Sequence, residues 1–301
     1  MTPKTYHHEG IANDTPCIIP TPPPYYLHID GDTSQLPAKE QQALIASSPE
    51  EACDFFRLLG NACKPVLSAE YRRLHPGLYE KLETIAASGL EDNATFSIDT
   101  AATLLKKVPL DLISLIDSHI ALREDDPIPP LIEKKMVHKT SESNILISEP
   151  FSCGNLHYFN MFLNTSELVF DHPSDHVQGM LILEAVRQAG IATAHLQGLP
   201  MDGVLALLVF NTNFISFVES GSPIVLRSYS TFSSDDTQNN KDYYVCIQAL
   251  QWGKVCSETV IKSVACMTTL RKQKINDQLS RILSRNKANF ADKIKGLIKT
   301  E

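Results

Sequence analysis

The sequence predicts an α+β fold, in which a mainly helical N-terminal region precedes an antiparallel sheet with one long helix on its inner face. The long helix is expected to begin near Val177 or Gly179 and is apolar on nearly every side, which is typical of a buried helix. β-rich segments follow this helix, and the last three alternate in hydrophobicity as half-buried strands do. These segments are residues 205–217, 224–232, 243–252 and 255–267.

The N-terminal part of the chain predicts an arm and then helices. Residues 1–36 are rich in proline and predict an irregular, extended arm, which the apolar side chains of residues 25–29 can pin to the body. Residues 37–123 have apolar residues at helical spacing and predict a small helical domain. Ser48 and Pro49 form a helix start, and Asp99 or Ser97 is a candidate cap for a later helix. Pro109 is expected to open the last helix of this region, and the region contains no chemical motif.

A charged and proline-rich segment separates the two parts of the chain. Residues 124–132 contain the run EDDPIPP and predict a linker. The domain that follows is expected to span residues 133–270, with residues 271–301 forming a separate basic helix. Before its long helix, this domain is expected to contain three short strands, at residues 145–147, 158–163 and 168–170.

Composition and charge exclude several classes of function. The 301 residues carry a formal net charge of -8, so nucleic acid is not an expected partner. No apolar run is long enough for a transmembrane segment, and no signal peptide is evident. The seven cysteines are scattered without a C-x-x-C pair, which indicates reduced thiols and a cytoplasmic location.

The C-terminal segment differs in charge from the rest of the chain. Residues 271–301 hold nine Lys or Arg and three Asp or Glu, so the preceding 270 residues account for a net charge of -14. Apolar residues at helical spacing predict an amphipathic helix with a basic outer face. This helix could pack its apolar stripe on the body, dock an acidic carrier protein through residues such as Arg281, Arg285 and Lys287, or lie on a membrane surface.

The residues that can carry chemistry surround the long helix. Glu184, Arg187, Gln188 and His195 share one stripe of this apolar helix, and a carboxylate at such a position must be paired or used. Glu184 and Arg187 are an obvious ion pair, which could act in catalysis or only fix the helix. In catalysis, Glu184 would be an acid/base or an orienting group, and Arg187 would be its partner or a phosphate anchor.

The turn before this helix is rich in histidine and aspartate. Gly179 and Met180 provide first-turn N–H groups that can polarise a thioester carbonyl, while His172 or His176 can act as an auxiliary base. Gln188 and Asp175 are further candidates for substrate binding. His172 and His176 lack a third ligand in a metal-binding pattern, so no metal is expected. No cofactor is expected either, because the chain has neither a glycine-rich phosphate loop nor a nucleophile elbow.

Two segments of this sequence resemble the A-factor biosynthesis (AfsA-like) family. Val137-His138-Lys139 resembles the V-H-K start of the family's repeat, and residues 170–189 resemble the signature before and along its central helix. The resemblance covers roughly residues 133–270. A more distant one, to the fatty-acid dehydratase motif, matches Glu184 directly and His172 only if two loop residues are dropped.

The resemblance implies a hotdog fold, in which an antiparallel sheet wraps round a long helix and two domains share their active sites. It also implies transfer of a β-ketoacyl group from acyl carrier protein or CoA to dihydroxyacetone phosphate, on the way to a γ-butyrolactone signal or another secondary metabolite. Glu184 and Arg187 occupy the helix positions carried over from the family.

The sequence departs from the family pattern in two ways. Only one V-H-K segment and one such helix are present, whereas family members of this length usually contain two repeats, so a homodimer is expected. Gln178 stands where a proline commonly precedes the glycine. A thioesterase, a dehydratase and a non-catalytic acyl-binding scaffold therefore remain alternatives to an acyltransferase.

Overall fold

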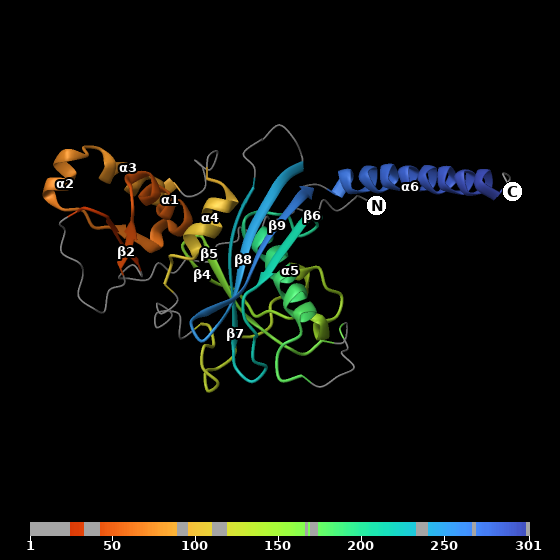
Figure 1. Cartoon of the computed structure of the whole chain (residues 1–301), viewed down its shortest axis with the longest axis horizontal. Coiled ribbons are helices and arrows are strands. Elements are labelled where there is room, and N and C mark those ends of the chain that lie inside the picture. Colours follow the sequence, from red (N-terminus) through yellow and green to blue (C-terminus); the bar gives the residue numbers. More distant parts are fainter. Residues whose placement is uncertain are drawn as a thin grey trace, which may run out of the picture.

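The computed structural model describes residues 25–32, 43–88, 96–109, 119–165, 168, 174–232, 240–266 and 269–298. Figure 1 shows an N-terminal α/β region beside a long twisted sheet, with a single helix extending from the far side of that sheet. Residues 169 and 170 of the predicted strand at 168–170, and most of the helix expected after Pro109, lie outside the described residues.

The C-terminal half is built on a six-stranded antiparallel sheet of order β4-β5-β7-β8-β9-β6. Its strands are β4 (Phe151–Cys153), β5 (Leu156–Met161), β6 (Val204–Phe214), β7 (Ile224–Phe232), β8 (Asn240–Gln251) and β9 (Lys254–Cys266). The four β-rich segments predicted after the long helix correspond to β6–β9. The expected strand at residues 145–147 makes only an isolated bridge, between Ile147 and Met161.

The long helix α5 (Gly179–Leu196) lies on the inner face of this sheet, as Figure 1 shows. Its apolar residues pack against inward-facing residues of β5, β7, β8 and β9 in one hydrophobic cluster. The Tyr243 hydroxyl on β8 also donates a hydrogen bond of 2.7 Å to the Gly190 carbonyl of α5. The sheet and its helix form a hotdog fold, which confirms the predicted fold class.

The N-terminal region combines helices with a small parallel sheet of order β2-β1-β3. Its elements are β1 (Tyr25–Ile29), β2 (Ala43–Ala46), α1 (Pro49–Leu59), η1 (Gly60–Ala62), β3 (Cys63–Pro65), α2 (Ala69–Leu74), α3 (Leu78–Ser88) and α4 (Ile98–Leu105). The N-caps of α1 and α4 are Ser48 and Ser97, as predicted.

The parallel sheet is a feature that the sequence did not reveal. Residues 25–29 fall in the segment expected to be an irregular arm, yet they form its central strand and are mostly buried. Each strand of this sheet has only three to five residues, which is too short for a clear alternation pattern. The helical description of the region was therefore incomplete.

The N-terminal region packs against the outer face of the six-stranded sheet. Its buried residues form one hydrophobic cluster with outward-facing residues of β5, β7 and β8, such as Tyr158, Tyr229 and Cys246. Arg227 of β7 is 1% exposed, and its guanidinium donates hydrogen bonds to the carbonyls of Leu105 and Val108 at the end of α4. Each face of the sheet therefore has its own core, α5 on one side and the N-terminal region on the other.

Two short 3-10 turns and one long helix complete the described chain. The turns η4 (Lys134–Val137) and η5 (Glu142–Asn144) precede β4, and α6 (Thr269–Ile298) follows β9. Among the described residues, no helix combines the length and hydropathy that crossing a membrane requires. The six described cysteines are buried, and none of them forms a disulfide with another described residue.

Candidate active site

The start of α5 places two of the predicted site residues at its first turn. Gln178 is the N-cap residue and makes no capping hydrogen bond through its side chain. A Cβ on Gly179 would lie 3.3 Å from the Phe214 ring, so glycine allows β6 to approach closely here. Met180 is 58% exposed, and its side chain therefore points away from the core.

Glu184 lies one and a half turns further along α5 and is the centre of a polar network. Its carboxylate accepts two hydrogen bonds of 2.7 Å from Arg187 and one of 2.9 Å from Gln188. Lys139 completes the network, with its ammonium nitrogen 3.0 Å from Oε1 of Glu184. The structure therefore brings Glu184, Arg187 and Gln188 together, as their helical spacing predicted.

Gln188 links this network to the segment that precedes β4. The side chain is fully buried; its Nε2 also donates to the Asn144 carbonyl, and its Oε1 accepts from the Leu146 backbone N–H. All three bonds hold the amide in one orientation, which in turn fixes the donor aimed at Glu184. Gln188 thus helps to hold the Glu184 carboxylate, and its role in substrate binding stays a prediction.

The electrostatics of the network keep Glu184 ionised. Burial alone would raise its pKa, but the hydrogen bonds from Arg187 and Gln188, the Arg187 charge and the Lys139 hydrogen bond lower it to about 2. A carboxyl group with this pKa carries no proton to donate near neutral pH. Of the roles considered for Glu184, the geometry favours orienting Arg187 and Lys139 over acid catalysis.

A histidine pair lies at the other end of α5. The Nε2 atoms of His138 and His195 are 3.0 Å apart, and Nδ1 of His195 lies 2.9 Å from the Leu199 carbonyl. A carbonyl only accepts, so Nδ1 of His195 carries the proton. Burial lowers the pKa of His195 despite this bond, so the ring is neutral and its Nε2 accepts from His138.

The V-H-K segment and the helix signature therefore meet in three dimensions. Lys139 binds Glu184 and its neighbour His138 binds His195, although 45 and 57 residues separate the partners. His138 has a left-handed backbone with φ of 55°, which turns the two side chains towards α5. Lys139, whose side chain is 8% exposed, is a site residue that spacing alone could not identify. Its place in the V-H-K motif was the available signal.

A small cavity lies beside Arg187, between α5 and the sheet. Its volume is about 80 Å³, and its walls include Leu207, Phe210 and Tyr243. Arg187 contributes to the same cavity, and its side chain is 38% exposed. The arrangement places a cation at the edge of an apolar space, which suits a ligand with an anionic or polar group and an apolar tail.

The polar loop before α5 does not join this network. Nδ1 of His176 lies 3.0 Å from Asp175 and 3.1 Å from Ser174, and its ring is tilted by 52° against the Phe217 ring at a centroid distance of 5.0 Å. The Asp175 side chain is 98% exposed, and the His176 hydrogen bond lowers its pKa. His172 lies outside the described residues. Asp175 and His176 therefore flank the start of α5 without contacting Glu184.

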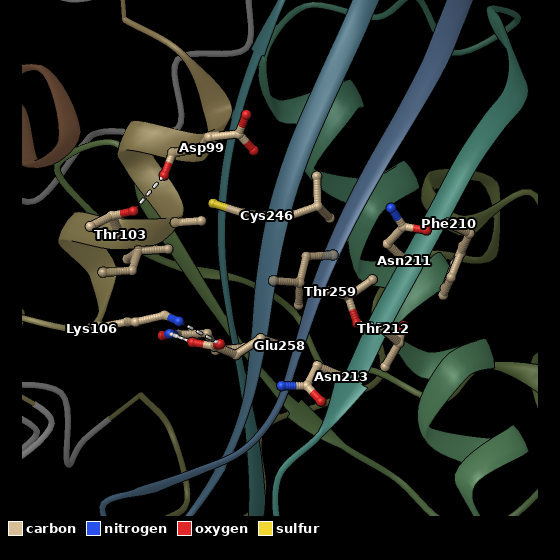
Figure 2. A pocket seen from close by; sticks show the side chains of 15 residues that line it. Asp99, Thr103, Lys106, Phe210, Asn211, Thr212, Asn213, Cys246, Glu258 and Thr259 are labelled. Atoms are coloured by element: carbon tan, nitrogen blue, oxygen red, sulfur yellow. Dashed lines mark hydrogen bonds and ion pairs between the residues drawn. The ribbon is translucent and has the colours of Figure 1, made fainter.

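A second, larger hollow lies on the opposite face of the sheet, where Figure 2 shows it between α4 and strands β8, β9 and β6. This groove has a volume of about 690 Å³, and its walls mix polar and apolar residues. A row of directly paired residues, Asn213, Glu258, Gln248 and Arg227, crosses the sheet along it. Lys106 binds Glu258 at 3.0 Å, so these charges are used to join α4 to the sheet.

Metal chemistry has no evident site in the part of the chain that the structure describes. No three His, Cys, Asp or Glu side chains gather there as a metal site would require.

Comparisons with known proteins locate this domain in a family. Residues 120–267 match the family model described as the A-factor biosynthesis hotdog domain. The match includes the segment predicted as a linker. No curated protein matches the chain.

Solved structures with a similar fold cover less than half of the chain. A putative thioesterase from Shewanella oneidensis is 16% identical, with 39% of this chain and 82% of that chain covered and a TM-score of 0.30. An uncharacterized protein from Pyrococcus horikoshii is 16% identical, with 46% and 95% covered and a TM-score of 0.32. The E. coli PaaI protein from the phenylacetic acid degradation operon is 15% identical, with 38% and 80% covered and a TM-score of 0.29.

The strand order, the helix on the inner face and the family match agree, and residues 120–267 of this chain are an AfsA-type A-factor biosynthesis hotdog domain.

Proposed function

We propose that this protein is an acyltransferase that moves a β-ketoacyl group from a carrier-protein or CoA thioester to an acceptor alcohol such as dihydroxyacetone phosphate. One observation carries the proposal: Lys139 and Arg187 converge on Glu184 beside an apolar cavity, within an A-factor biosynthesis hotdog domain. The product would be a precursor of a γ-butyrolactone-like signal or another secondary metabolite.

Each residue of the network has a role in this proposal. Arg187 would bind the anionic part of the substrate, such as the phosphate of the acceptor, because a guanidinium matches phosphate geometry. Glu184 would hold Arg187 and Lys139 in place, so that their charges need not be reoriented during the reaction. The first-turn N–H groups at Gly179 and Met180 would polarise the thioester carbonyl, and His176 or His172 would assist proton transfer.

The working enzyme would be a homodimer formed through β6. This strand lies at the edge of the sheet, where Leu207 and Leu208 are 54% and 57% exposed. An exposed apolar edge invites pairing with another strand. The cavity beside Arg187 also uses Leu207 and Phe210 of β6, so a second copy would enlarge and close a space too small for an acyl chain.

The test is intact-mass analysis of β-ketoacyl carrier protein incubated with the enzyme, with and without dihydroxyacetone phosphate. Loss of the acyl group is expected only when the acceptor is present. The Glu184→Gln variant should be slower by roughly 100-fold, because it weakens the hold on Arg187 and Lys139. Glu149→Gln, which changes an exposed glutamate of the same domain, should retain full activity.

The other outcomes distinguish the alternatives. Loss of the acyl group without an acceptor would identify a thioesterase, and loss of water from a β-hydroxyacyl substrate would identify a dehydratase. No change in any mixture, together with binding of the acyl chain, would leave a non-catalytic acyl-binding protein. Leu208→Glu should give monomers in light scattering and lower activity; an active monomer would contradict the shared site.

A further inference from the structure

The helix α6 is attached to the body only at its start. It has 30 residues, which corresponds to about 45 Å at 1.5 Å per residue, and Figure 1 shows it extending away from the sheet after β9. Every residue from 280 to 295 is exposed. The large apolar residues in this described stretch, Ile282, Leu283, Phe290 and Ile294, are therefore not packed on the body, although such packing was one of the arrangements expected from the sequence.

An apolar stripe runs along one side of the described part of α6. Since each residue turns the helix by about 100°, Leu283, Phe290 and Ile294 lie within roughly 40° of one another. They are 58%, 66% and 40% exposed, respectively. A stripe of this kind on a water-exposed helix marks a surface that binds something.

The charges on α6 are distributed around this stripe in a defined way. Lys287 and Lys293 lie about 60° to either side of Phe290, so a cation borders each edge of the stripe. Asp277 and Asp292 lie on the opposite half of the helix, at about 140° and 160° from Phe290. Among the described side chains, the half with the stripe thus carries two lysines and no acid, whereas Arg281, Arg285 and Lys295 lie on the other half with the two aspartates.

We propose that α6 binds an anionic lipid surface, with the apolar stripe in the interface and the lysines at the headgroups. A flat anionic surface meets both lysine edges at once, and lysine stems can lie along the interface while their ammonium groups reach the headgroups. Pairing of α6 with a second copy would bring lysine edges together and is opposed by repulsion.

The position of α6 also separates it from the acidic body. Residues 1–270 carry a net charge of -14, which would repel an anionic surface at close range. At about 0.1 M salt, electrostatic interactions are screened over roughly 10 Å. The length of α6 places most of its turns beyond this distance, so the lysines can act without cancellation by the body.

The test is sedimentation of the full chain with two kinds of vesicle, phosphatidylcholine alone and phosphatidylcholine with a quarter phosphatidylglycerol. Binding is expected only to the anionic vesicles and should weaken at high salt. Phe290→Asp should reduce partitioning roughly tenfold or more, because it removes buried apolar area and adds an acid to the stripe. Ala288→Asp is the matched control, since it adds the same charge about 160° from Phe290 and should reduce binding less.

Three results would overturn the proposal. The first is that the wild type does not sediment with anionic vesicles. The second is that Phe290→Asp and Ala288→Asp lose vesicle binding to the same extent. The third is that Phe290→Asp abolishes self-association in light scattering, or binding to acyl carrier protein, while neither the wild type nor the variant binds vesicles. Thermal melting of each variant checks that the body is intact. None of these measurements depends on acyl transfer, so the outcome is separate from that of the proposed enzymatic activity.

Discussion

Arg227 and Arg187 lie on opposite faces of the six-stranded sheet and illustrate two uses of the arginine side chain. Arg227, on the outer face, is 1% exposed and donates to Gln248 and to carbonyls at the end of α4. Arg187, on α5, is 38% exposed and pairs with Glu184 beside a cavity. An arginine whose donors are directed at the protein's own backbone joins two parts of the chain, whereas one at a cavity edge can meet a ligand.

The largest expected effect comes from removing the outer arginine. Arg227→Met should lower the free energy of unfolding by roughly 3–5 kcal/mol, because Gln248 and the α4 carbonyls lose their buried donor. Urea unfolding measures this change. Lys262→Met, which replaces a partly exposed cation of β9 that pairs with Asp242 of β8, should change the free energy of unfolding far less. Equal losses of unfolding free energy in the two variants would mean that Arg227, which joins α4 to the sheet, stabilises the protein no more than a cation at the surface.

A substitution at Gly154 tests, through packing, the same contact between the N-terminal region and the six-stranded sheet. Gly154 has φ of 59°, and a Cβ there would lie 1.7 Å from the Leu59 carbonyl of α1. Gly154→Ala should therefore destabilise the protein by roughly 2–3 kcal/mol in thermal or urea unfolding. Gly198 has φ of 101°, and a Cβ there would have nothing within 4 Å. Gly198→Ala should therefore cost only the backbone strain of about 1 kcal/mol. Similar values for both would show that the N-terminal region does not depend on this contact.

The inner-face network is expected to reveal itself through acid sensitivity. Because the pKa of Glu184 in the folded protein is about 2, below its ordinary value of 4.5, its contribution is fully present above about pH 4.5 and is lost as the pH falls towards 2. The difference in unfolding free energy between wild type and Glu184→Gln should shrink by roughly 2 kcal/mol from pH 6 to pH 3. A difference that does not change with pH would mean that Glu184 is not held as an ion.

The smallest expected effect concerns His157 of β5, whose Nε2 lies 3.4 Å from Nε2 of Gln197 at the end of α5. Burial lowers its pKa from 6.5 to about 4, so the folded protein keeps it neutral and stability falls as the pH drops below 6.5. Wild type should lose about 1–2 kcal/mol more than His157→Gln between pH 7 and pH 5. The exposed His75→Gln should behave as wild type in the same titration. Parallel pH profiles for all three proteins would count against a buried neutral His157.

The sequence by itself determined the hotdog half of this protein and the grouping of residues on α5. Alternation fixed β7, β8 and β9, and the period of the helix placed Glu184, Arg187 and Gln188 on one stripe, because both patterns depend only on local geometry. The short parallel strands of the N-terminal region carried no such pattern.

Only the tertiary structure decided which distant residues complete the network and which do not. Lys139 reaches Glu184 across 45 residues of sequence, whereas His176 and Asp175, which are close to α5 in the chain, point elsewhere. Tertiary contacts of this kind arise from how whole elements pack, so their partners cannot be read from spacing along one segment. The same packing gave Arg227 its partners at the end of α4, left α6 exposed, and separated two arginines of identical chemistry into different roles.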